Sequence, residues 1–126
     1  MAAEKKTILV VDDEPDVRTF LSTLFEDSGY ATVMAQDGNE ALSKVKEKAP
    51  DLVTLDITMP NKSGVRFYRE MKESDEWRKV PIIIVTGVSG DFRTFISTRK
   101  KVPPPEGYLS KPIDKTEILN LVKKLA

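Results

Sequence analysis

Five side chains that could bind a metal or react stand where short apolar runs of the sequence end. Asp12 and Asp13 follow the first run, Asp56 the third and Thr86 the fourth, and Lys111 follows the last. If these runs are parallel strands of one sheet, their carboxyl ends share an edge, and the five side chains converge there. Three carboxylates, one hydroxyl and one ammonium group would then form a single site.

This set of groups suits magnesium and phosphoryl chemistry. Clustered carboxylates repel one another unless a cation compensates their charge, and Mg²⁺ binds through a few carboxylates while accepting phosphate oxygens. Three carboxylates, one Mg²⁺ and Lys111 sum to zero charge. A carboxylate can also attack phosphorus to form an acyl phosphate, with positioning and electrostatics supplying most of the catalysis. The Thr86 hydroxyl could then donate a hydrogen bond to a phosphoryl oxygen.

The composition excludes several other kinds of site. The chain has 126 residues, which fits one domain over 1–126. It contains neither cysteine nor histidine, so zinc sites built from them and histidine-activated nucleophiles are excluded.

Lys plus Arg and Asp plus Glu are equal at 20 each, which argues against nucleic acid or an anionic membrane as a partner. No apolar run could span a bilayer, and no signal peptide is evident, so we expect a cytoplasmic protein.

The elements that would position these residues alternate along the chain. Apolar, β-branched runs predict strands at 7–11, 30–35, 51–55, 81–86 and 108–109. Helical spacing between caps and breakers predicts helices at about 15–28, 38–49, 65–73, 91–99 and 115–125. Asp37 and Asp114 are expected to cap the second and last helices, and Val65, Tyr68 and Met71 to form the inner face of the third. Five successive βα units predict a parallel sheet with helices on both faces.

Four segments match the pattern of a known family: ILVVDDE (8–14), DLVTLDITMPNKSG (51–64), PIIIVTG (81–87) and GYLSKPI (107–113). Through them the chain resembles the receiver domain of bacterial two-component response regulators over essentially its whole length. The resemblance implies a flavodoxin-like α/β fold, with a doubly wound five-stranded parallel sheet in the order 2-1-3-4-5 flanked by five helices. It implies a stand-alone signalling switch, similar to chemotaxis regulators, which promotes its own phosphorylation and slow dephosphorylation and is not otherwise an enzyme.

The resemblance also implies roles for individual residues at the sheet edge. Asp56 would be the phosphoacceptor, and Lys111 would pair with the phosphoryl group. Mg²⁺ would be bound directly by Asp13, through water by Asp12, and also by Asp56 and the backbone carbonyl of Thr58.

Signalling would depend on a second set of residues implied by the resemblance. Thr86, besides its part in catalysis, would form a switch pair with Tyr108. The donor would be a histidine kinase or histidine phosphotransfer protein, since this chain has no histidine. Output would pass to another protein, or to a second copy of the chain, through the face around residues 91–120. The chain departs from the usual family pattern at Gly87 and in the basic, proline-rich segment 99–106.

Three other functions fit the same residues less well. A haloacid-dehalogenase-like phosphatase requires a second Asp two residues after its nucleophile, where this chain has Thr58. A nucleotide-binding protein requires a glycine-rich loop after the first strand, where Asp12, Asp13 and Glu14 stand. A phosphorylation-independent scaffold of the same fold usually lacks one of the acidic or basic site residues, all of which are present. Singly, each residue would more often be a cap or a turn residue, and the joint occurrence at four strand ends favours the phosphoacceptor.

Overall fold

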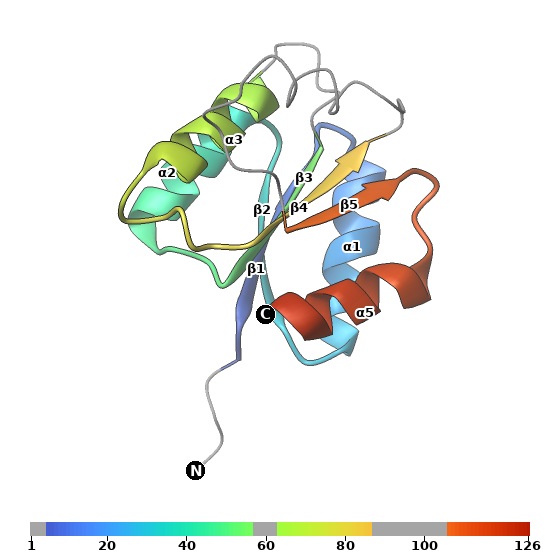
Figure 1. Cartoon of the computed structure of the whole chain (residues 1–126). Coiled ribbons are helices and arrows are strands. Elements are labelled where there is room, and N and C mark those ends of the chain that lie inside the picture. The colour runs from blue at the N-terminus through green and yellow to red at the C-terminus, as the bar shows by residue number, and fades with distance from the viewer. Residues whose placement is uncertain (1–4, 57–62, 87–105) are drawn as a thin grey trace.

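The computed structural model describes residues 5–56, 63–86 and 106–126 of the protein (Figure 1). Its strands are β1 (Thr7–Val11), β2 (Ala31–Ala35), β3 (Leu52–Asp56), β4 (Ile82–Thr86) and β5 (Gly107–Ser110). They form one parallel sheet in the order β2-β1-β3-β4-β5. The predicted flavodoxin-like sheet and its strand order are therefore confirmed.

Helices cover both faces of this sheet. They are α1 (Pro15–Asp27), α2 (Gly38–Glu47), α3 (Ser63–Glu73) and α5 (Lys115–Leu125). Helices α2 and α3 lie on one face, and α1 and α5 lie on the other (Figure 1). The helix predicted at 91–99 falls outside the described residues. Within the described part of the chain, no helix has the length and apolar character needed to cross a membrane.

Two apolar cores hold the layers together, because neighbouring strand residues point to opposite faces. Leu9 and Val11 of β1 face the α2–α3 core, which Phe67 and Tyr68 also join. Ile8, the residue before Leu9, faces the α1–α5 core instead. A strand covered on both faces requires a continuous apolar run, and TILVV in β1 is such a run.

The predicted helix boundaries have visible causes. The Asp37 carboxylate accepts a hydrogen bond from the Glu40 amide at 2.8 Å, and Asp114 accepts one from the Glu117 amide at 2.9 Å. These bonds satisfy amide groups that the first turn of a helix leaves unpaired. Gly29, with a φ of 97°, follows α1 in a conformation that only glycine adopts readily.

The predicted strand at 51–55 is shifted by one residue in the structure. Asp51 lies outside β3, and its carboxylate accepts a hydrogen bond from the Thr7 amide at 2.7 Å. Asp56 is instead the last residue of β3 and pairs with Val85 of β4. The difference matters for function, since it makes Asp56 part of the rigid sheet.

The predicted inner face of α3 is also partly wrong. Val65 is only half-buried, whereas Phe67, Tyr68 and Met71 are fully buried. Residues three, four and seven positions after Gly64 lie on one helix stripe, and Gly64 itself is buried. The prediction is therefore confirmed for Tyr68 and Met71 and wrong for Val65, and it missed Phe67.

A buried hydroxyl in β3 lowers the stability of the sheet. Thr54 is 1% exposed and pairs with Val10 and Ile83, two residues of the α1–α5 core. Its hydroxyl has no hydrogen-bond partner within residues 5–56, 63–86 and 106–126, the part that the structure describes. Because an unpaired buried hydroxyl costs free energy and valine has nearly the same shape, Thr54→Val should raise the free energy of unfolding by about 1 kcal/mol. Urea denaturation measures this change.

The matched control is Thr32→Val on β2, because the Thr32 hydroxyl donates a hydrogen bond to the Glu26 carboxylate at 2.6 Å. That variant should gain no stability. A loss of stability in Thr54→Val would mean that the hydroxyl is hydrogen-bonded in solution.

Candidate functional site

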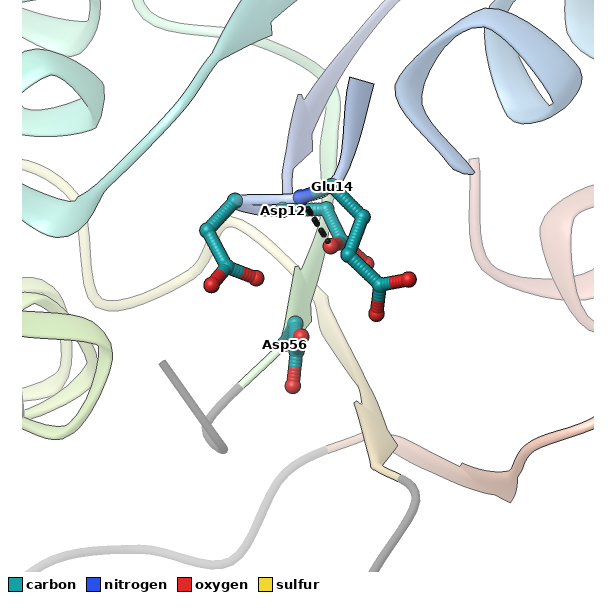
Figure 2. A group of neighbouring side chains, drawn as sticks. Asp12, Glu14 and Asp56 are labelled. Carbon is teal, nitrogen blue, oxygen red and sulfur yellow. Dashed lines mark hydrogen bonds between the residues drawn. The ribbon is translucent and has the colours of Figure 1, made fainter. Parts of the chain in front are cut away.

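Two buried carboxylates lie side by side at the carboxyl edge of the sheet. Asp12 directly follows β1, and Asp56 ends β3, the strand that pairs with β1 through Val11 and Leu55. Asp12 is 2% exposed and Asp56 is 1% exposed. Figure 2 shows both side chains at this edge, together with Glu14 from the turn after β1. Burying two neighbouring carboxylates is unfavourable unless a positive charge compensates their repulsion.

The backbone around Asp12 holds its carboxylate rigidly. The Asp12 amide donates to the Ala35 carbonyl at 3.1 Å, and the Arg18 guanidinium donates to the Asp12 carbonyl at 2.7 Å. One carboxylate oxygen of Asp12 accepts the Glu14 amide at 2.9 Å. Burial raises the pKa of Asp12 to about 6, with the nearby charge of Asp56 adding to the rise against the opposing effects of the Glu14 amide and Lys111. The surroundings of Asp12 therefore disfavour the negatively charged form of its carboxylate.

Lys111 supplies positive charge to these carboxylates. Its Nζ lies 3.1 Å from Glu14 Oε1, 3.3 Å from Asp12 Oδ2 and 3.4 Å from Asp56 Oδ2. Burial alone would lower the pKa of Lys111, but the charges of Asp56 and Asp12 and the hydrogen bonds to Glu14 and Asp12 raise it above its ordinary value. The lysine therefore stays protonated and bridges residues from the ends of β1 and β3.

Four carboxylates gather at this edge. Asp12, Asp13, Glu14 and Asp56 can each offer one oxygen such that all four oxygens lie within 4.8 Å of one another. Asp13 and Glu14 are exposed, so an ion could reach the group from solvent. With Lys111 included, the formal charge of the group is −3, from four negative charges and one positive. This oxygen-only, strongly negative set fits a hard divalent cation such as Mg²⁺.

The comparison with protein families identifies this arrangement. The model of the response regulator receiver domain matches residues 8–123. The chain belongs to this family. Receiver domains are phosphoacceptor signalling switches of two-component systems rather than classical enzymes, and they generally bind Mg²⁺ at an acidic pocket.

Individual relatives of this receiver domain include separate regulators and parts of larger proteins. It is 35% identical over 121 residues to the polar-differentiation response regulator DivK of Brucella anthropi, covering 94% of each chain. It is 36% identical over 119 residues to the CAI-1 autoinducer sensor kinase/phosphatase CqsS of Vibrio cholerae, covering 94% of this chain but 17% of that protein. The solved structure of Vibrio cholerae chemotaxis protein CheY4 shares the fold, with a TM-score of 0.84 at 24% identity over 98% of this chain and 100% of that one.

The receiver domain brings together the predicted acidic residues and the lysine whose side chains the structure describes. Asp12, Asp13, Asp56 and Lys111 converge as expected. Thr58 lies outside the described residues.

The predicted switch residues lie on β4 and β5, which follow β3 in the order of the sheet. Thr86 ends β4 and pairs with Ser110, but its side chain is outside the described part of the chain. Tyr108 on β5 pairs with Ile84 and is 37% exposed. Strand β5 thus contains Tyr108, and Lys111 is the residue that directly follows this strand.

The sequence predicted no role for Glu14, although among the described residues it is the carboxylate closest to Lys111. One signal was present: Glu14 directly precedes Pro15, a residue favoured in the first turn of a helix. That places Glu14 at the N-cap, where shorter polar side chains are preferred. A glutamate there is available for another contact.

Proposed function

We propose that this receiver domain, spanning 1–126, is the phosphoacceptor of a two-component phosphorelay and carries the phosphoryl group on Asp56. The observation that supports this most strongly is a buried Asp56 carboxylate with Lys111 Nζ 3.4 Å away. An oxygen of Asp56 attacks the phosphorus of a phosphohistidine or a small acyl phosphate. A new O–P bond forms while the donor's N–P or O–P bond breaks, and that bond's electron pair leaves with the imidazole or carboxylate.

Lys111 and Thr86 assist this transfer in the proposal. The Lys111 ammonium group compensates charge on the phosphoryl oxygens, and the Thr86 hydroxyl donates a hydrogen bond to one of them. Because Lys111 Nζ already lies 3.4 Å from Asp56 Oδ2, the lysine needs little reorganisation at the moment of transfer. The result is a phosphorylated Asp56 whose extra negative charge is held beside a fixed cation.

The acidic group would hold Mg²⁺ through Asp12, Asp13 and Asp56, with the Thr58 backbone carbonyl as a further ligand. When bound, the ion supplies positive charge that neutralises phosphoryl oxygens. The support is the donor set itself, since four carboxylate oxygens within 4.8 Å of one another suit a hard cation.

Signalling would follow from a shift between two packings of β4 and β5. Thr86 moves toward the phosphoryl group, and Tyr108 turns inward, in an equilibrium that phosphorylation biases. The donor is a histidine kinase or phosphotransfer protein, because this chain has no histidine of its own. The output partner, another protein or a second copy, binds the face around residues 91–120. We place the protein in the cytoplasm, with no nucleic-acid or membrane partner.

The direct test is phosphorylation of the whole chain by acetyl phosphate, followed by intact-mass spectrometry. One phosphoryl addition is expected with Mg²⁺. Chelating the metal should slow the reaction by about a hundredfold or more, since a metal contributes several kcal/mol to such transfers. An unchanged mass at saturating donor and metal contradicts the phosphoacceptor role. An equal rate in chelator contradicts the role of Mg²⁺.

A further inference from the structure

Glu14 occupies the N-cap of α1 but does not act as a cap. Its side chain makes no capping hydrogen bond to the first turn of the helix. Its Oε1 instead lies 3.1 Å from Lys111 Nζ, closer than the nearest oxygens of Asp12 and Asp56 at 3.3 Å and 3.4 Å. Three carboxylates of the described residues contact Lys111, and the nearest of them is Glu14, for which the sequence predicted no role.

The backbone of Glu14 is fixed even though its carboxylate faces solvent. Its amide donates to Asp12 at 2.9 Å, and its carbonyl accepts the Arg18 amide at 3.1 Å. The side chain itself is 61% exposed, against 2% for Asp12 and 1% for Asp56. Glu14 therefore carries an exposed carboxylate on a hydrogen-bonded backbone, and Figure 2 shows its side chain beside that of Asp12.

We infer that Glu14 is a positioning residue that restrains the Lys111 ammonium group at the solvent side of the site and thereby sets the balance between cation binding and phosphoryl binding. The inference rests on the proposed function, since it assigns Lys111 to the phosphoryl group. It follows from charge as well as distance. Glu14 adds one negative charge to a group that must attract a divalent cation, and it competes with the phosphoryl group for the same lysine.

Removing this charge should have opposite effects on the two ligands. Glu14→Gln leaves the acidic group less negative and lets Lys111 move closer to Asp12 and Asp56, and both changes weaken Mg²⁺ binding. The same two changes favour a negatively charged group on Asp56. Replacing a residue that merely supports the loop would weaken the binding of both ligands. Opposite changes in the two affinities therefore distinguish a positioning role from a supporting one.

The experiment compares wild type, Glu14→Gln and a matched control, Asp16→Asn. Asp16 is an exposed acid two residues further along, in the first turn of α1, with no ion pair to Lys111 in the described structure. Mg²⁺ affinity is measured by calorimetric titration, and affinity for the phosphoryl mimic beryllofluoride is measured at saturating Mg²⁺. For Glu14→Gln, Mg²⁺ affinity should fall about threefold to tenfold and beryllofluoride affinity should rise by a similar factor, as expected for one partly solvated charge.

Asp16→Asn should shift each affinity less than twofold, about the effect of one screened surface charge. Opposite shifts in Glu14→Gln with little change in the control support the inference. Shifts of the same sign, no shift, or equal shifts in both variants overturn it. Failure of the proposed function shows separately: Asp56→Asn would then still be phosphorylated, or wild type would accept no phosphoryl group at all.

Discussion

Asp56→Asn should abolish phosphorylation by acetyl phosphate, leaving a single unmodified mass where wild type gains one phosphoryl group. The amide has nearly the shape of the carboxylate but lacks a nucleophilic oxygen, and loss of a catalytic nucleophile can reduce a rate on the order of a millionfold. The fold should survive, because the change removes a negative charge that lies beside the buried Asp12 carboxylate. Intact-mass spectrometry and urea denaturation of the same samples measure both effects.

The control for this variant lies at the other end of the same strand. Asp51 immediately precedes β3, is exposed, and accepts the Thr7 amide at 2.7 Å, far along the strand from Lys111. Asp51→Asn should be phosphorylated at the wild-type rate. Phosphorylation that persists in Asp56→Asn, or that disappears in Asp51→Asn, would show that the acceptor is not Asp56.

Glu106→Gln should destabilise the protein by about 3 kcal/mol, because it leaves a buried lysine without its counter-ion. Lys72 of α3 has a side chain that is 1% exposed, and its Nζ lies 2.7 Å and 2.8 Å from the two Glu106 carboxylate oxygens. Glu106 Oε1 also accepts the Ile82 amide at 2.8 Å, where β4 begins. One carboxylate thus ties α3 and β4 to the residue just before β5.

The two partners of this ion pair should respond unequally to substitution. The Glu106 side chain is 34% exposed, so water can solvate it when Lys72→Met removes the buried cation. That variant should lose only about 1 kcal/mol, and adding it to Glu106→Gln should recover part of the lost stability. Urea denaturation of the two single variants and the double variant measures these differences.

An exposed ion pair on the same helix provides the comparison. Arg66 and Glu70 lie 3.2 Å apart in α3, with side chains 71% and 36% exposed. Glu70→Gln should change stability by about 0.5 kcal/mol or less, as is usual for such pairs. If Glu106→Gln costs no more than Glu70→Gln, the Lys72 ammonium group must reach solvent in the folded protein.

These contacts also explain how the start of β5 is held. Gly107 follows Glu106, and a side-chain carbon at Gly107 would come within 3.1 Å of Ile83. The ion pair and this close approach hold β5 against β4, and Lys111 follows one residue after β5 ends. Contacts at the start of β5 thus anchor the strand that leads to Lys111.

Local sequence patterns were enough to predict the parallel sheet and several of the residues at its carboxyl edge. Apolar runs such as TILVV indicate strands buried on both faces, and the residue after each run must lie at the end of its strand. Asp12 and Asp56 could be placed in this way because the strands follow from local periodicity and the position of each aspartate follows from strand direction. The caps at Asp37 and Asp114 were predictable for the same reason, since a cap involves residues a few positions apart.

Two ion pairs could not be predicted from the sequence and became evident only in the folded structure. Glu14 and Lys111 are 97 residues apart, and Lys72 and Glu106 are 34 apart. Neither pair leaves a periodic signal, because a long side chain can reach several partners and its choice depends on how the surrounding elements pack. Local pattern therefore places residues along an element, whereas the distance and burial that give an ion pair its strength arise only when separate elements come together.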